Sequence, residues 1–330
     1  MDKNRAMLIL PKVSVVIAVY NAEDFLRECL DSVLAQRLRD IEVICVNDGS
    51  SDGSLDILRE YEKKDSRVRV IDQENQGAGA ARNAGLRAAK GEFLSFLDAD
   101  DFFEPHMLEE AYRFIRVADA DVCVFASDLY VHKEGCYKPC TWSFRKQYFP
   151  LEEPYDPSAE KYRDNIYRMF NGWAWDKLFR RSFILEHGLT FQNLRTTNDM
   201  FFVFIALAKA HRIVCTDQIL AHQRVEVSSS LSRNREKSWD CFYIALAAMQ
   251  EELKASGLYE TYKRAFVNWT LNFSLWQLKT MTGEAQEKAE ELMRSKGFAQ
   301  LDVADYPEDL FFSKQEYEQY RKIMAGPEMI

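Results

Sequence analysis

The sequence lacks the features that mark membrane-spanning, secreted and nucleic-acid-binding chains. No stretch of its 330 residues reaches the roughly 18 uninterrupted apolar residues that a spanning helix needs. The first residues lead into a short apolar run without the layout of a signal peptide. A net charge of -9 at pH 7 argues against a nucleic-acid backbone as the main partner. We therefore expect a cytoplasmic protein with no nucleic-acid partner.

The sequence also lacks the pattern of cysteines that forms disulfides in small secreted proteins. The seven cysteines are an odd number, and most of them fall inside apolar runs. Cys136 and Cys140 have neither the tight spacing nor the neighbouring ligands of a zinc site. We expect reduced cysteines, most of them in the core. The chain also contains no internal repeat and no low-complexity tract.

What the sequence does contain is a series of short apolar runs separated by amphipathic stretches. The runs at 13–19, 41–46, 68–71 and 93–97 are predicted strands, and the stretches between them have helical periodicity. Asn21 is expected to cap the first helix. Strands that alternate with helices are typical of βαβ units. The pattern therefore predicts an α/β fold with a mostly parallel central sheet flanked by helices.

The second half of the chain is less regular and then becomes helical. Its predicted elements are a helix at 106–117, a strand at 121–126, a hairpin at 129–137, helices at 159–170 and 199–210, and short strands at 212–216 and 218–224. From about residue 235 onward, long helical patterns continue without a strand signal. We therefore expect a domain over 1–235, with halves at about 12–130 and 131–235, and a helical extension over 236–330.

Three carboxylates follow the fourth predicted strand directly, in the segment Asp98-Ala99-Asp100-Asp101. Open α/β sheets bind ligands at the carboxyl ends of their strands, so these acids are placed for function. The carboxylates of Asp98 and Asp100 are hard oxygen donors that suit Mg2+ or Mn2+, with a substrate diphosphate completing the coordination. The structural alternative is an ordinary acidic turn after a strand.

A glycine-rich segment after the third strand imitates a dinucleotide-binding fingerprint. It reads G-x-G from Gly77, and Asp98 follows about twenty residues later, as the ribose ligand of an NAD site would. Arg82, however, stands where close helix–strand packing requires glycine or alanine. The D-x-D sequence also resembles the nucleophile motif of a phosphohydrolase, but Asp101-Phe102 departs from that pattern. Both interpretations are weaker than one that uses all the motifs together.

Four segments occur in this order at or just after predicted strand ends. They are Val15-Val16-Ile17-Ala18-Val19-Tyr20-Asn21, Asn47-Asp48-Gly49-Ser50-Ser51-Asp52-Gly53, the segment Asn75 to Gly85, and Phe96-Leu97-Asp98-Ala99-Asp100-Asp101. As an ordered set, they closely resemble glycosyltransferase family 2, the inverting transferases of GT-A fold. The likeness is continuous over residues 12–105 and patchy to about 232.

The resemblance implies a site for a uridine nucleotide and a metal ion. The residues that it implies at the nucleotide are Ala18, Tyr20, Asn21, Asp48, Arg82, Asp98 and Ala99. Asp100, together with Asp98, is implied to hold the Mn2+ or Mg2+ ion that bridges the two phosphates. The structural alternatives are a core tyrosine, a turn aspartate and a helix-surface arginine.

The resemblance also implies a catalytic base. In this family the base is the aspartate of a Glu-Asp pair at the start of a helix, and Asp199 has that context. Asn198 stands in place of the usual glutamate, so its contact with the sugar is in question. An ordinary helix cap is the alternative for Asp199.

Two further segments are implied to line the donor or acceptor pocket. Trp175 and Lys177 belong to a stretch that resembles the family's Trp-Asn-Lys-Leu segment, with Asp176 in place of asparagine. A core tryptophan beside a surface lysine is the alternative. His222, Arg224 and Ser230 stand where the family often has a flexible loop over the diphosphate. A structural histidine on a strand is the alternative there.

The implied function is metal-dependent transfer of a sugar from a nucleotide-sugar, expected to be a UDP-sugar, to a saccharide or lipid-linked saccharide in surface or exopolysaccharide synthesis. Two alternatives stay open: a non-catalytic nucleotide- or saccharide-binding protein on the same scaffold, and a dinucleotide-dependent oxidoreductase. The aromatic face from Phe266 to Trp276 is most simply core packing. Its alternatives are peripheral contact with the inner face of a membrane and contact with a second copy of the chain.

Overall fold

A computed structural model describes residues 10–225 and 236–326, whose strands form one nine-stranded sheet. Its order is β3-β2-β1-β4-β8-β6-β9-β5, with β7 beside β6. The first four strands are β1 (Val13–Val19), β2 (Ile41–Asp48), β3 (Val68–Gln73) and β4 (Phe93–Asp98). They pair in parallel, so their carboxyl ends meet at one edge. Their β-branched and aromatic residues favour strands that are buried on both faces.

The remaining strands extend this sheet with mixed directions. They are β5 (Phe102–Phe103), β6 (Val122–Val131), β7 (Cys136–Pro139), β8 (Lys177–Arg180) and β9 (Ile213–Val225). β8 lies antiparallel between β4 and β6, while β9 runs parallel to β6. The two short strands expected at 212–216 and 218–224 are therefore one strand, with a register shift opposite Phe125–Ser127. The expected hairpin is confirmed by the antiparallel pairing of β6 with β7.

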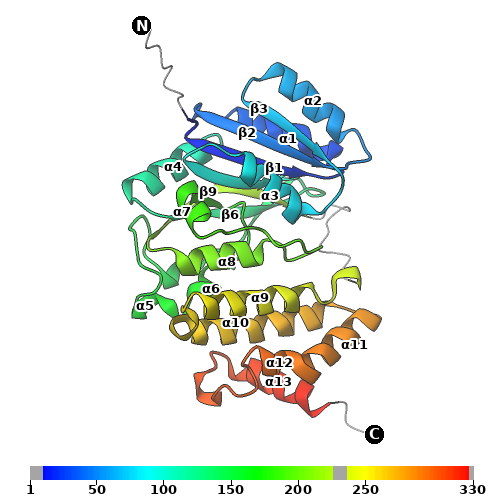
Figure 1. Ribbon diagram of the computed structural model, residues 1–330, viewed down its shortest axis with the longest axis vertical. Coiled ribbons are helices and arrows are strands. Elements are labelled where there is room, and N and C mark those ends of the chain that lie inside the picture. Colours follow the sequence, from blue (N-terminus) through cyan, green and yellow to red (C-terminus); the bar gives the residue numbers. More distant parts are fainter. Residues whose placement is uncertain (1–9, 226–235, 327–330) are drawn as a thin grey trace.

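Helices cover both faces of the sheet. One face packs against α1 (Glu23–Leu34), α2 (Ser54–Lys64) and α4 (Met107–Val117). The other packs against α3 (Ala78–Ala88) and α8 (Met200–Lys209). In place of one helix at 159–170 there are two short ones, α5 (Glu160–Arg163) and α6 (Ile166–Met169), and α7 (Arg181–Glu186) follows β8. Figure 1 shows α8 between the sheet and the C-terminal helices.

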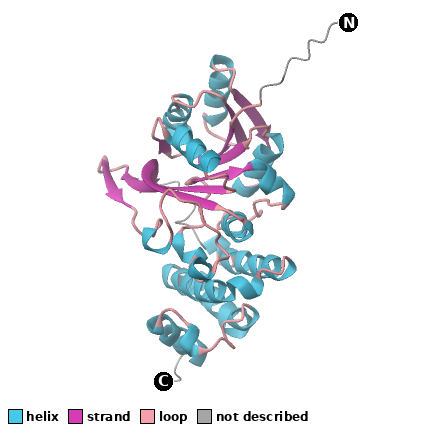
Figure 2. Cartoon of the chain, turned by 90° about the vertical axis from the view of Figure 1, so that its left-hand side faces the viewer, coloured by secondary structure: helices cyan, strands magenta, loops and turns pink. Residues whose placement is uncertain are grey.

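The C-terminal segment forms helices α9 (Cys241–Ala255), α10 (Tyr259–Thr280), α11 (Gly283–Leu292), α12 (Phe298–Gln300) and α13 (Lys314–Ala325). Figure 2 shows them gathered below the sheet. Their apolar side chains join those of α8 and of one sheet face in a single core cluster. On α10, Phe266 is fully buried whereas Trp276 is 46% exposed. The aromatic face is thus mainly core packing, and none of the described helices is long and apolar enough to cross a membrane.

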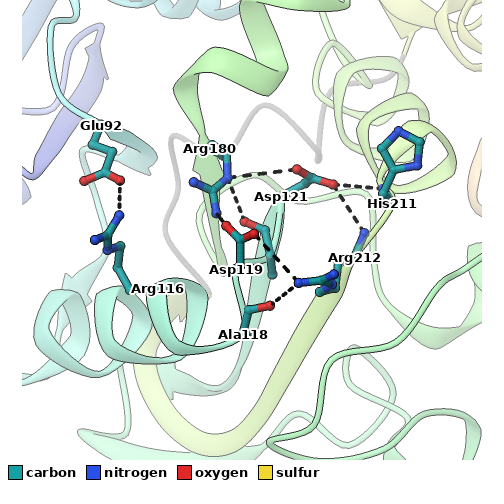
Figure 3. Close-up of polar contacts among 9 residues, drawn as sticks. Glu92, Arg116, Ala118, Asp119, Asp121, Arg180, His211 and Arg212 are labelled. Atoms are coloured by element: carbon teal, nitrogen blue, oxygen red, sulfur yellow. Dashed lines mark hydrogen bonds and ion pairs between the residues drawn. The ribbon is translucent and has the colours of Figure 1, made fainter.

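At the amino-end edge of β6 and β9, charged residues join three strands (Figure 3). Arg180 Nη2, at the end of β8, donates to Asp119 Oδ1 at 2.8 Å. Asp121 accepts hydrogen bonds from the backbone N–H groups of His211 and Arg212, just before β9. These contacts hold the ends of β6, β8 and β9 together at the edge of the sheet opposite the acidic segment that follows β4.

Two local expectations are settled by the structure. The seven cysteines are all free and six are buried, as expected of reduced core residues. Asn21, however, does not cap α1, whose N-cap is Ala22 without a side-chain bond. The backbone of Asn21 has a φ of 47°, and its amide oxygen instead accepts a hydrogen bond from Ser51 N at 2.8 Å. The side chain therefore joins the turns after β1 and β2.

Candidate active site

The candidate site lies where the carboxyl ends of β1, β2 and β4 meet. Ala18 pairs in register with Val46 on one side and with Asp98 on the other. Tyr20 follows β1 directly and is 50% exposed, so its ring is available at this edge. The structure thus brings Ala18, Tyr20 and Asp98 to one edge of the sheet, which is where open α/β sheets bind ligands.

Asp48 is the last residue of β2, and its buried carboxylate accepts hydrogen bonds from the loop that follows β3. It accepts hydrogen bonds from Gln76 N at 2.9 Å, Gly77 N at 2.8 Å and Gln73 Nε2 at 2.8 Å. Gly77 has a φ of 93°, which L side chains rarely adopt, and it precedes α3. Asp48 therefore holds the loop that leads into α3. Its predicted contact with a nucleotide base stays a prediction.

Asp98, Asp100 and Asp101 form a tight turn between β4 and β5. The backbone N–H of Asp101 donates to Asp98 O at 3.3 Å. Arg224 on β9 holds this turn: its N–H donates to Asp101 Oδ1 at 2.8 Å and its Nε to Asp100 O at 2.9 Å. Its Nη2 also donates to Glu28 Oε2 at 2.6 Å. The position of Asp100 is thus set from a strand more than 120 residues away in sequence.

Two carboxylates of this turn, those of Asp100 and Asp101, have raised pKa values, because the nearby arginines offset only part of the effect of burial and mutual repulsion. Burial raises the pKa of Asp100 to about 6, and the charge of Asp98 adds to this shift while Arg224 and Arg82 oppose it. Burial likewise raises the pKa of Asp101 well above its usual range. Two crowded carboxylates of this kind match the ligands that Mg2+ and Mn2+ prefer. Among the described residues, no group of three or more acidic, histidine or cysteine side chains could hold a metal by itself. Asp98 and Asp100 are the two acids of this turn that the sequence analysis predicts as metal ligands, and as oxygen donors they match the preference of such an ion.

Arg82 on α3 connects this turn to the start of α8. Its Nη2 donates to Asp98 Oδ1 and its Nη1 to Asn198 Oδ1, both at 2.6 Å. It is not on the helix surface, because it is only 8% exposed. Its Nε is buried without a hydrogen-bond partner. Arg82 thus brings Asp98 near the residue that precedes Asp199.

Asp199 stands immediately before α8 but does not cap it, because its side chain makes no capping hydrogen bond. Burial raises the pKa of Asp199 to about 6; the charge of Arg82 opposes this shift, and the charge of Asp98 adds to it. A carboxylate with a pKa near 6 that is not committed to its own helix is suited to accept a proton near neutral pH.

Asn83 is a residue that the sequence analysis missed. Its side-chain amide exchanges two hydrogen bonds with the backbone of Phe191, both of 2.8 Å. A Cβ on Gly79 would lie 2.0 Å from Gln192 O, so α3 and the 191–192 backbone touch closely. Both contacts fix the loop that leads to Asp199. The presence of Asn83 beside Arg82 within a helix was the signal available in the sequence, because asparagine seldom favours helix interiors.

Trp175 and Lys177 are buried and do not line an open surface. Trp175 is 2% exposed and belongs to the core. Lys177 is not a surface lysine: its Nζ donates to Asp176 Oδ1 at 2.6 Å, Trp173 O at 2.8 Å and Asn171 O at 3.1 Å. Because an ammonium group has three donors, these bonds use its full capacity. Both residues support the edge of the site from within.

His222 and Arg224 lie on β9 rather than in a loop, and both are buried. His222 Nδ1 is 2.6 Å from Asp128 Oδ1, and its Nε2 is 3.1 Å from Glu104 Oε1. These two acids occupy both ring nitrogens, so His222 has the contacts of a structural histidine. Ser230 lies outside the described residues.

Comparison with known proteins decides the family. A family model of glycosyl transferase family 2 matches residues 14–187. EpsH of Bacillus subtilis, which is named as a glycosyltransferase, is 33% identical over 293 residues, covering 87% of this chain and 82% of its own. The chain belongs to glycosyltransferase family 2. Poly(ribitol-phosphate) beta-glucosyltransferase of Bacillus spizizenii is 30% identical to this glycosyltransferase. The match covers 86% of the present chain and 44% of the relative.

A solved structure supports the fold of this glycosyltransferase. The crystal structure of S. aureus TarS 1-349 in complex with UDP-GlcNAc superposes with a TM-score of 0.72 at 21% identity. The match covers 95% of the present chain and 90% of TarS 1-349. The glycosyltransferase therefore has the GT-A fold expected from its motifs. The oxidoreductase alternative is set aside, because the chain belongs to a glycosyltransferase family.

Proposed function

We propose that this glycosyltransferase moves a sugar from a UDP-sugar to a saccharide acceptor, with a divalent metal ion and with inversion at the anomeric carbon. The observation that carries the proposal is the chain of contacts that runs from the acidic turn to the candidate base. Arg82 bonds to Asp98 on one side and to Asn198, the neighbour of Asp199, on the other. The pair of acids proposed to hold the metal ion and the proposed proton acceptor are therefore close together, as a single displacement requires.

The nucleotide is assigned to the ends of β1, β2 and β4. The exposed ring of Tyr20 would lie against the uracil, and backbone groups near Ala18 would contact its edge. Asp48 and Asn21 would shape this subsite by holding the turns around it. Arg82, Asp98 and the backbone of Ala99 would approach the ribose and the phosphates.

Asp100, with Asp98, would hold the metal ion. A bound Mn2+ or Mg2+ would neutralise the negative charge that develops on the departing UDP. Arg224 keeps the Asp100 backbone in place through the 2.9 Å bond to its carbonyl oxygen. The carboxylate therefore needs little rearrangement when a diphosphate arrives.

Asp199 would take the proton of the acceptor hydroxyl as that oxygen attacks the anomeric carbon. The O–H bond breaks, a C–O bond forms, and the bond from the anomeric carbon to the diphosphate breaks with its electrons leaving on UDP. One displacement inverts the anomeric centre and needs no covalent enzyme intermediate. The name of one relative, poly(ribitol-phosphate) beta-glucosyltransferase, supports a saccharide or polyol-phosphate polymer as the product.

The test is a screen of UDP-glucose, UDP-galactose and UDP-GlcNAc for UDP release with Mn2+, with and without acceptor saccharides. We expect release from at least one donor and its loss in Asp199→Asn. No release from any donor, with intact UDP binding in calorimetry, would instead support a non-catalytic nucleotide-binding protein.

A further inference from the structure

Three tryptophans form a continuous ladder from the core to the surface. Trp175 is 2% exposed, Trp173 is partly buried and Trp142 is 49% exposed. The rings of Trp173 and Trp175 stack, with centroids 4.9 Å apart and an interplanar angle of 22°. Trp142 meets Trp173 edge-on at 5.2 Å and 74°. The outer indole is thus held by the inner two while half of its surface faces solvent.

The ladder stands at the same edge of the sheet as the acidic turn. β8 runs antiparallel to β4, with Phe93 opposite Arg180 and Leu94 opposite Phe179. Because the two strands are antiparallel, the amino end of β8 at Lys177 points toward the edge where β4 ends, and the turn that precedes Lys177 carries Trp173 and Trp175.

The segment that carries the ladder also touches the start of α8. A Cβ on Gly172 would lie 3.3 Å from the Cα of Met200, the residue after Asp199. Trp173, the next residue, therefore follows a segment that touches the start of α8.

The segment that carries Trp142 is tied to the one that carries Trp173. Asn171 N donates to Ser143 O at 3.3 Å, and Phe144 forms a β-bridge with Phe170. Phe144 and Phe170 are themselves buried. Trp142 is therefore positioned before any ligand binds, which lowers the entropy cost of binding.

We propose that Trp142 and Trp173 form an aromatic platform that binds a pyranose ring of the acceptor saccharide. This inference rests on the proposed function, in which an acceptor hydroxyl must reach Asp199. One face of a β-glucopyranose presents axial C–H groups, which pack against the electron-rich face of an indole while the equatorial hydroxyls remain at the rim.

The order of strands favours the acceptor over the donor as the ligand. The nucleotide subsite proposed above uses β1 and β2, which lie on one side of β4. Trp173 lies in the segment that leads into β8, on the other side of β4, and Trp142 packs against Trp173. A sugar on the platform would thus approach from the side opposite the nucleotide, as an in-line displacement requires.

The test measures saturation transfer by NMR from the full-length protein to cellobiose, a β-linked pyranose disaccharide, and to ribitol 5-phosphate, which has no ring. The variants are Trp142→Ala, Trp173→Ala and the conservative Trp142→Phe. Trp276→Ala is the matched control, because Trp276 is 46% exposed on α10 among the C-terminal helices. UDP affinity in the presence of Mn2+ is measured for each protein by calorimetry.

We expect saturation of cellobiose by the wild-type protein, strongest at the axial H-1, H-3 and H-5. The signal should persist in Trp276→Ala and Trp142→Phe. The affinity for cellobiose should fall about tenfold in Trp142→Ala and Trp173→Ala. UDP affinity should change less than about twofold in all of them.

Absence of transfer to cellobiose in the wild type, or equal transfer in Trp142→Ala, would overturn the platform. So would tryptophan-dependent binding of ribitol 5-phosphate alone, or a parallel loss of UDP affinity that assigns the indoles to the donor. Failure of the proposed function has a different signature, namely no UDP release from any donor while cellobiose binding persists.

Discussion

Arg82 and Asp98 form an ion pair, with 2.6 Å between Nη2 and Oδ1, that joins helix α3 to the end of strand β4. Arg82 is nearly buried and also holds Asn198, so one guanidinium sets the distance between the acidic turn and the start of α8. Its planar fork is suited to two acceptors at once, which a lysine ammonium cannot reproduce at the same positions.

Replacing Arg82 should separate these two parts of the site. In Arg82→Met, Asp98 and Asn198 both lose their partner. We expect a loss of about 2–3 kcal/mol in the free energy of unfolding, below the usual cost for a buried pair because the Asp98 side chain is 33% exposed. Arg82→Lys keeps the charge and should recover part of this stability but little of kcat/KM. Chemical denaturation and UDP-release kinetics measure the two quantities. Full activity in Arg82→Lys would show that the fork geometry is unimportant.

The rate should depend on pH through Asp199. Its pKa of about 6 means that the carboxylate is ionised above pH 6 and protonated below it. A base must be ionised to accept a proton, so kcat/KM, which reports the pKa values of the free enzyme, should be flat above about pH 7 and fall about tenfold for each pH unit below 6. Measurement of kcat/KM across this pH range checks the prediction. A flat profile down to pH 5 would assign the base to another group.

The same carboxylate should cost stability at neutral pH. The pKa of Asp199 is raised in the folded chain above its unfolded value of 3.8, so the protonated form favours folding. This contribution is fully present below pH 3.8 and is lost as pH rises through 6. We therefore expect Asp199→Asn to be more stable than wild type at pH 8, by about 2–3 kcal/mol at most, and to have no advantage at pH 4.

Thermal unfolding at the two pH values, with the wild-type chain beside the variant, provides the check on Asp199→Asn. A gain of equal size at pH 4 and pH 8 would point to packing or hydrogen bonding, since neither changes with ionisation of the carboxylate.

Arg224 should control metal affinity without contacting the metal. In Arg224→Lys the backbone N–H still reaches Asp101, but the bond from Nε to Asp100 O is lost. We expect Mn2+ in the presence of UDP to bind about tenfold more weakly, because the turn is then free to move. The amount of free Mn2+ follows from its electron paramagnetic resonance signal.

Arg180→Lys is a suitable control for that experiment. Arg180 makes comparable charged contacts at the opposite edge of the sheet (Figure 3), so it tests the general effect of losing a guanidinium. Equal loss of Mn2+ affinity in both variants would contradict a specific role for Arg224.

The first four strands could be predicted from sequence to within two residues at each end. Their β-branched runs are bounded by polar turns, and this local signal does not depend on the rest of the fold. The insertion of β8 between β4 and β6 could not be predicted, because periodicity carries no information about strand order. The pair Phe102–Phe103 forms β5 only because β9 provides a partner.

Side-chain roles were harder to predict than elements. Lys177 would be expected at a surface, yet its adjacent Asp176 and two carbonyl groups make burial favourable. Asn21 has the composition of a helix cap, but the neighbouring turn with Ser51 competes for its amide oxygen. In both cases the hydrogen-bond partner depends on how the chain folds around the residue, and the sequence pattern does not show this.

The core shared by the sheet, α8 and the C-terminal helices has a consequence for how the molecule denatures. The proposed division near residue 235 follows a change in sequence pattern, whereas the apolar side chains pack across it as one cluster. Lys209 on α8 and Glu252 on α9 also form an ion pair across it. Heating should therefore melt both parts in one cooperative transition, and neither part would survive as a separate folding unit.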